Sequence, residues 1–150
     1  MNVNVAINPV YYPYLKDERR LQIYYGGSSS GKSFFLCQRI ILDLVEGKRN
    51  YLVIRNVMAT IRLSTFNELT KAILSMNVQN YFNINMSNLT ITCKLNNKQI
   101  MFYGCDQIEK VKSITPKDGV LTDIFIEEAT EVDYNSYKQL RKRLRGRSDV

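Results

Sequence analysis

The most informative part of this sequence is Gly26-Gly27-Ser28-Ser29-Ser30-Gly31-Lys32-Ser33, which fits the phosphate-binding pattern G-x-x-x-x-G-K-[ST]. The preceding segment Leu21–Tyr25 is predicted to be a buried strand. Apolar residues at helical spacing from Phe34 to Leu44 predict a helix that ends near Gly47. A strand, a glycine-rich loop and a helix form the context that this motif requires.

Each position of the loop has a physical role. Glycines let the backbone curl so that successive N–H groups point toward an anion, and the helix N-terminus adds partial positive charge. Lys32 is predicted to reach the β- and γ-phosphates of a nucleotide, and the Ser33 hydroxyl is predicted to bind Mg²⁺. A chance Gly/Ser-rich turn is the structural alternative, and the flanking strand and helix count against it.

A pair of carboxylates is predicted to complete this site. The strand Leu121–Ile126 is followed directly by Glu127 and Glu128. Nucleotides bind at the carboxyl ends of strands in α/β sheets. We therefore assign Glu127 to Mg²⁺ and Glu128 to the attacking water, as its base or orienting group. Two solvated acids at a strand end are the alternative interpretation.

The nucleotide is predicted to be ATP. A guanine-specific site would usually carry N-K-x-D, and the segment Asn97–Ile100 lacks the aspartate. A carboxylate beside the γ-phosphate suits hydrolysis by water. The predicted cofactors are ATP and Mg²⁺.

The remaining patterns predict an α/β fold. Residues 1–20 are expected to form an extended arm because Pro9 and Pro13 disfavour regular structure, and its tyrosines either pack on the domain or stack on a base. Further predicted elements are a strand at 51–54, a helix from a capping box at 65–68 to about 77, an antiparallel hairpin of 89–93 and 99–104, and a final helix with Asp133 as its N-cap.

Composition narrows the class of protein. Hydrophobic residues make up 45% of the 150 residues, which is enough for a folded core. The chain contains no histidine, so Ser-His-Asp and Cys-His catalysis are excluded. Its net charge of +7 favours a polyanionic partner. Three dispersed cysteines and no long apolar run predict a soluble, reduced, intracellular protein without a membrane partner.

Taken together, the motifs resemble the ATPase half of the large terminase subunit of tailed bacteriophages. The resemblance extends from about Leu21 onward and is most specific at 26–33 and at 126–131, which reads I-E-E-A-T-E. It implies an ASCE (RecA-like) P-loop core with three layers, a mainly parallel sheet and an antiparallel hairpin. Lys32 and Ser33 would be the Walker A residues, and Glu127 and Glu128 the Walker B pair.

The resemblance also implies a biological setting. Large terminases use ATP hydrolysis to move double-stranded DNA into a procapsid through the portal protein. They assemble as rings of identical subunits with a small terminase subunit, in the cytoplasm of the infected bacterial host. An arginine is often supplied by a neighbouring subunit, and Arg55, Arg62 and Lys112 are the candidates here.

Two structural features of the family, its coupling strand and its nuclease domain, are expected to be absent from this sequence. The family's coupling strand follows Walker B and lies between the P-loop strand and the Walker B strand. Residues 21–150 would therefore form a truncated ATPase domain without the nuclease domain, from a fragment, a split gene or a rearranged fold. We expect the chain alone to be a poor ATPase.

The last predicted helix carries a basic face. Arg141 and Arg145 are the candidate DNA-binding residues within a cluster of six cations at 138–147, and a solvated helix face is the alternative. Two other functions stay open at this point. One is a different P-loop ATPase, such as a helicase-like enzyme, and the other is a DNA-binding module with an inactive nucleotide site.

Overall fold

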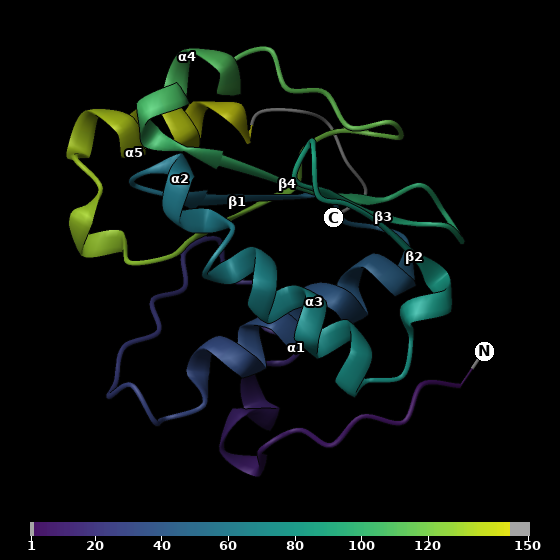
Figure 1. Cartoon of the computed structure of the whole chain (residues 1–150). Helices are drawn as coiled ribbons and strands as arrows, with labels where there is room; N and C mark the ends of the chain where they lie inside the picture. Colours follow the sequence, from purple (N-terminus) through teal and green to yellow (C-terminus); the bar gives the residue numbers. More distant parts are fainter. Residues whose placement is uncertain (1, 145–150) are drawn as a thin grey trace.

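The computed structural model describes residues 2–144, which form a mixed five-stranded sheet with the strand order β2-β3-β4-β1-β5 (Figure 1). The central strand β1 runs parallel to both β4 and β5, whereas β2 and β3 join the sheet in antiparallel fashion. The strand bounds are β1 Tyr51–Arg55, β2 Phe82–Asn85, β3 Thr90–Cys93, β4 Gln99–Gly104 and β5 Asp123–Ile126. The α/β prediction is confirmed.

Helices cover both faces of the sheet. One face carries α1 and α3, and the other carries α4 and α5 (Figure 1). Alternation along β1 explains both layers, because Val53 belongs to the core beneath α1 and α3 while Leu52 and Ile54 belong to the core that includes Leu140 of α5. The helix bounds are α1 Lys32–Glu46, α2 Met58–Ile61, α3 Thr65–Ser75, α4 Ile108–Val111 and α5 Tyr134–Arg143, with 3-10 turns η1 Pro9–Tyr14, η2 Gln79–Tyr81, η3 Cys105–Gln107 and η4 Ala129–Glu131.

The predicted strand before the P-loop is wrong. Residues 21–25 form no strand, and Leu21, Ile23 and Tyr25 are 62%, 77% and 92% exposed. Their alternation suits a strand, but a strand needs a hydrogen-bonding neighbour. Among residues 2–144, β5 pairs only with β1, so it is an edge strand and is partly exposed instead of lying in the sheet interior. Residues 21–25 pair with none of the five strands and lie outside the sheet.

The hairpin prediction is confirmed, and its second strand joins the main sheet. β3 and β4 are antiparallel, and Asn97 in their turn has a positive φ of 60°. β4 then pairs in parallel with β1. The additional strand β2 was not predicted.

The N-terminal arm is only partly extended. Residues 9–14 form the 3-10 turn η1, although Pro13 lies inside it. The arm is docked on α1, because the side-chain amide of Gln38 donates a hydrogen bond of 3.0 Å to the carbonyl of Ala6 and Ile7 is buried.

The start of α2 approaches the end of β4 very closely. A Cβ atom on Gly104 would collide with the backbone nitrogen of Met58, so only glycine fits there. The carboxylate of Asp106 accepts a hydrogen bond of 3.1 Å from that same nitrogen. These contacts hold the segment after β1 against the carboxyl edge of the sheet.

Candidate nucleotide-binding site

The P-loop and the glutamate pair lie at the same edge of the sheet. α1 ends at Glu46, shortly before β1 begins, so its N-terminus lies at the carboxyl end of β1 (Figure 1). The loop Gly26–Ser33 leads into that N-terminus. Glu127 and Glu128 follow the carboxyl end of β5, which is parallel to β1. The two parts of the predicted site therefore lie toward the same end of the sheet, but no hydrogen bond or ion pair found among residues 2–144 joins the loop to either glutamate.

The loop is folded back on itself by Lys32. Gly31 is the N-cap of α1 with a left-handed φ of 75°, a conformation that glycine adopts without strain. The Lys32 ammonium donates hydrogen bonds to the carbonyls of Gly26 and Gly27, at 3.1 and 3.4 Å. Residues 26–31 are exposed, so the loop is open to a ligand from solvent.

A tyrosine of the arm supports the loop. The Tyr11 hydroxyl donates a hydrogen bond of 2.6 Å to the carbonyl of Ser30, and its ring stacks on Phe35 with the ring centroids 4.7 Å apart. Tyr11 thus packs on the domain, whereas Tyr12 is 57% exposed. The contact of Tyr11 with the loop was not predicted, because nothing in the local sequence pattern indicates it.

Glu127 is held by two side chains from other elements. The Thr65 hydroxyl donates a hydrogen bond to Oε2 of Glu127, and Nη1 of Arg55 lies 4.0 Å from the same oxygen. The backbone N–H of Glu127 also donates to the carbonyl of Ile54 at 2.9 Å, which continues the pairing of β5 with β1. Glu128 is exposed and has a left-handed backbone, with φ of 51°.

The capping box predicted at the start of α3 is wrong. The N-cap is Ser64, whose side chain makes no capping hydrogen bond, and Thr65 is the first helical residue. Its hydroxyl bonds to Glu127 instead.

Two other ionisable groups lie near Glu127. Burial raises the pKa of Glu68, and the nearby charge of Glu127 raises it further. Burial likewise raises the pKa of the Cys37 thiol, with smaller contributions from both glutamates.

Arg55 was a candidate for an arginine supplied to a neighbouring subunit. In this chain it lies beside Glu127, with its side chain 24% exposed, and its role in a neighbouring subunit stays a prediction. Its position at the end of β1 explains why it lies beside Glu127, because β1 and β5 are adjacent parallel strands. Arg62 is exposed on the segment before α3.

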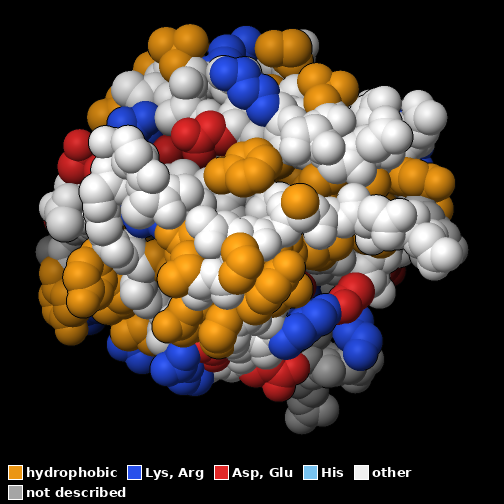
Figure 2. All heavy atoms as spheres, turned by 90° about the horizontal axis from the view of Figure 1, so that it is seen from below, with side chains coloured by type: hydrophobic (Ala, Val, Ile, Leu, Met, Phe, Trp, Pro, Cys, Tyr) orange, Lys and Arg blue, Asp and Glu red, His pale blue; other side chains and the backbone are white. Residues whose placement is uncertain are grey.

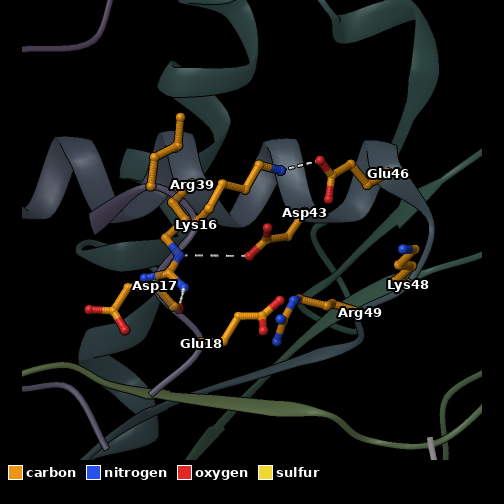
Figure 3. Close-up of a pocket in the computed structure, with 9 residues that line it drawn as sticks. Lys16, Asp17, Glu18, Arg39, Asp43, Glu46, Lys48 and Arg49 are labelled. Carbon is orange, nitrogen blue, oxygen red and sulfur yellow. Dashed lines mark hydrogen bonds and ion pairs between the residues drawn. The ribbon is translucent and has the colours of Figure 1, made fainter. Parts of the chain in front are cut away.

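A hollow between the arm and the end of α1 is a separate feature (Figure 3). It lies toward the amino edge of the sheet, since Arg49 pairs at 3.0 Å with Asp123, the first residue of β5. Within it, Asp43 accepts a hydrogen bond from Tyr51, and burial raises the pKa of Asp43. The lining residues are Leu15, Lys16, Asp17, Glu18, Arg39, Asp43, Glu46, Lys48 and Arg49. The hollow is lined by four cationic and four acidic side chains, so their formal charges cancel. A site without net positive charge does not favour binding of a triphosphate.

The basic helix α5 begins as predicted. The Asp133 carboxylate caps it by accepting a hydrogen bond of 2.9 Å from the backbone N–H of Ser136. Arg141 is exposed and lies over the Tyr137 ring at 5.8 Å, whereas Arg143 turns inward and donates to the carbonyl of Ile114. Arg145, the other candidate for DNA contact, lies outside the described residues.

Hydrophobic side chains gather on the face of the molecule around the arm (Figure 2). Val10 and Tyr12 of η1 are among the exposed apolar residues, as are Leu21 and Ile23.

Within the described part of the chain, no helix has the length and apolar character needed to cross a bilayer. No group of three or more histidine, cysteine or acidic side chains that could hold a metal ion is found among residues 2–144.

Comparison with known proteins identifies the family. The model of a family described as phage terminase large subunit matches residues 18–149. This chain belongs to the phage terminase large subunit family. It is 36% identical over 140 residues to the PBSX phage terminase large subunit of Bacillus subtilis strain 168, covering 93% of this chain and 31% of that protein. It is 33% identical over 106 residues to the terminase large subunit of Bacillus phage SPP1, covering 71% and 25% of the two chains.

A solved terminase shares the fold. The structure of the large terminase from a thermophilic bacteriophage matches with a TM-score of 0.63 at 16% sequence identity, over 80% of this chain and 30% of that one. The terminase chain described here thus spans about a third or less of each of these relatives.

Proposed function

We propose that this chain is the ATP-hydrolysing part of a phage DNA-packaging motor, with an ASCE-type P-loop core. The sheet topology supports the proposal most strongly. In a chain of the terminase family, the loop Gly26–Ser33 leads into α1 at the end of the sheet where β1 and β5 terminate, and Glu127–Glu128 follow β5 at that same end. That edge is where α/β sheets bind nucleotides.

The side chains present suit Mg²⁺ and a triphosphate. Hydroxyl and carboxylate oxygens are ligands that Mg²⁺ prefers, and Ser33 and Glu127 supply one of each. When bound, Mg²⁺ neutralises charge on the β- and γ-phosphates. Lys32 would leave the carbonyls of Gly26 and Gly27 to contact phosphate oxygens. Glu128, exposed at the same edge, would orient the attacking water and accept its proton.

The motor setting is part of the same proposal. ATP hydrolysis would drive double-stranded DNA into a procapsid, with a portal protein and a small terminase subunit as partners and a ring of identical subunits as the working assembly. The site of action would be the cytoplasm of the infected host. The net charge of +7 supports a polyanionic partner such as DNA.

Binding of ATP by the 150-residue chain tests the proposal. A fluorescent ATP analogue titrated with Mg²⁺ or with EDTA should bind tightly only when Mg²⁺ is present. Steady-state hydrolysis should stay slow with or without DNA, because β5 has a free edge in the described structure. Absence of Mg²⁺-dependent binding would contradict the proposed nucleotide site, and fast DNA-stimulated turnover would contradict only the expectation of slow hydrolysis.

Charge reversal on α5 tests the interaction with DNA. Arg141→Glu should weaken binding to duplex DNA and reduce the slope of log affinity against log salt by about one for each phosphate that the side chain no longer neutralises. Lys71→Glu on α3 is the matched control, because Lys71 is also exposed and lies on the opposite face of the sheet. A salt slope for Arg141→Glu equal to that of the control would show that Arg141 does not contact phosphate.

A further inference from the structure

Both contacts to the Glu127 carboxylate fall on one of its two oxygens. Thr65, the first residue of α3, donates its hydroxyl hydrogen to Oε2, and Arg55, the last residue of β1, lies at 4.0 Å from Oε2. None of the hydrogen bonds found among residues 2–144 involves Oε1. The Glu127 side chain is 16% exposed, so it is partly accessible to solvent.

The Thr65 contact is unusual for a residue in the first turn of a helix. Threonine hydroxyls there commonly bond to nearby backbone groups of their own segment. Ser64 does this, since its hydroxyl donates to the carbonyls of Thr60 and Ile61. The Thr65 side chain is fully buried, and a buried hydroxyl needs a partner. Its partner is the carboxylate of Glu127, which lies 62 residues further along the chain.

We propose that Thr65 and Arg55 are positioning residues that hold Oε2 of Glu127 and leave Oε1 free to face the metal. The inference rests on the proposed function, which assigns Glu127 to Mg²⁺.

Side chains that contact a metal-binding carboxylate affect the affinity of the site for the metal. Residues that hydrogen-bond to a metal ligand typically contribute 10–100-fold to metal affinity or activity. The Thr65 hydrogen bond is removed in Thr65→Val, which has nearly the same shape, and is kept in Thr65→Ser. The two variants therefore separate the hydroxyl from the packing of the side chain.

The experiment measures metal affinity directly. Mn²⁺ is titrated by electron paramagnetic resonance into an equimolar mixture of the 150-residue chain and a non-hydrolysable ATP analogue, with the analogue alone as the reference, and thermal unfolding is recorded for each variant without nucleotide. Thr65→Val should weaken Mn²⁺ binding about 10–100-fold. Thr65→Ser should bind Mn²⁺ close to the wild-type value. A purely structural role would lower thermal stability in Thr65→Val without changing Mn²⁺ affinity, and that result would overturn the inference.

Two further variants keep the test decisive. Arg55→Gln examines the second contact and should weaken Mn²⁺ binding in the same direction, even if Thr65→Val does not fold. In a Glu127→Gln background, Thr65→Val should weaken binding no further, because coupled residues are not additive. Equal weakening in both backgrounds would overturn the inference. If Glu127→Gln itself binds Mn²⁺ like the wild type, the assignment of Glu127 in the proposed function fails as well, which is a distinct result.

Discussion

Replacing Lys32 with alanine is expected to weaken binding of ATP about 10–100-fold, because a charge-assisted hydrogen bond is worth about 1.5–3 kcal/mol. In the structure, the Lys32 ammonium already lies over the loop, bonded to the carbonyls of Gly26 and Gly27. A phosphate in the loop would replace these two neutral acceptors with charged ones. Titration of a fluorescent ATP analogue in the presence of Mg²⁺ measures the change.

Lys48→Ala is the matched control for Lys32→Ala. Lys48 lies just after α1, is exposed, and stands at the far end of the helix from the P-loop. Its removal also lowers the net charge by one, so it reports any general electrostatic effect on a triphosphate. Equal affinities of the two variants for ATP would contradict the role assigned to Lys32.

Asn50→Ala is expected to lower the free energy of unfolding by about 2–4 kcal/mol, since buried polar groups left without partners are costly. Asn50 is 1% exposed and precedes β1. Its side-chain amide donates to the carbonyls of Asp118 and Val120 at 2.7 and 3.0 Å, and its side-chain oxygen accepts from the backbone N–H of Gln99 at 2.9 Å. One side chain thus joins the starts of β1, β4 and β5.

Urea unfolding monitored by circular dichroism measures this destabilisation. Asn67→Ala is the control, because Asn67 is exposed on α3 and its removal should change stability by no more than about 0.5 kcal/mol. The effect also bears on the site, since the chain segment held by Asn50 leads into β5 and hence to Glu127. A destabilisation no larger than that of the control would show that the Asn50 hydrogen bonds are not important for stability.

Local patterns predicted the parts of the fold that depend on neighbouring residues. The helix after the P-loop, the hairpin turn at Asn97 and the N-cap at Asp133 were all confirmed. Each depends on hydrophobic periodicity or on a backbone preference within a few residues. The apolar run before Glu127 likewise predicted β5, which places the glutamates at a strand end.

Features that depend on distant partners were not predicted. Residues 21–25 have the alternation of a strand, but strand formation requires a neighbour that the sequence of the segment does not reveal. The pattern T-x-x-E at 65–68 matches a capping box, yet the Thr65 hydroxyl bonds to Glu127 across the fold. The contact of Tyr11 with Ser30 is of the same kind. Tertiary contacts therefore determined the details of the candidate site.

We propose that Ser33 and Glu127 hold one metal ion beside a bound triphosphate. A crystal structure of the 150-residue chain with Mn²⁺ and a non-hydrolysable ATP analogue tests this most directly, because the anomalous signal of Mn²⁺ locates the metal. We predict a single peak bonded to the Ser33 hydroxyl, to Oε1 of Glu127 directly or through one water, and to phosphate oxygens contacted by Lys32. A peak away from Glu127, or a nucleotide bound with Lys32 still on the carbonyls of Gly26 and Gly27, would contradict the claim.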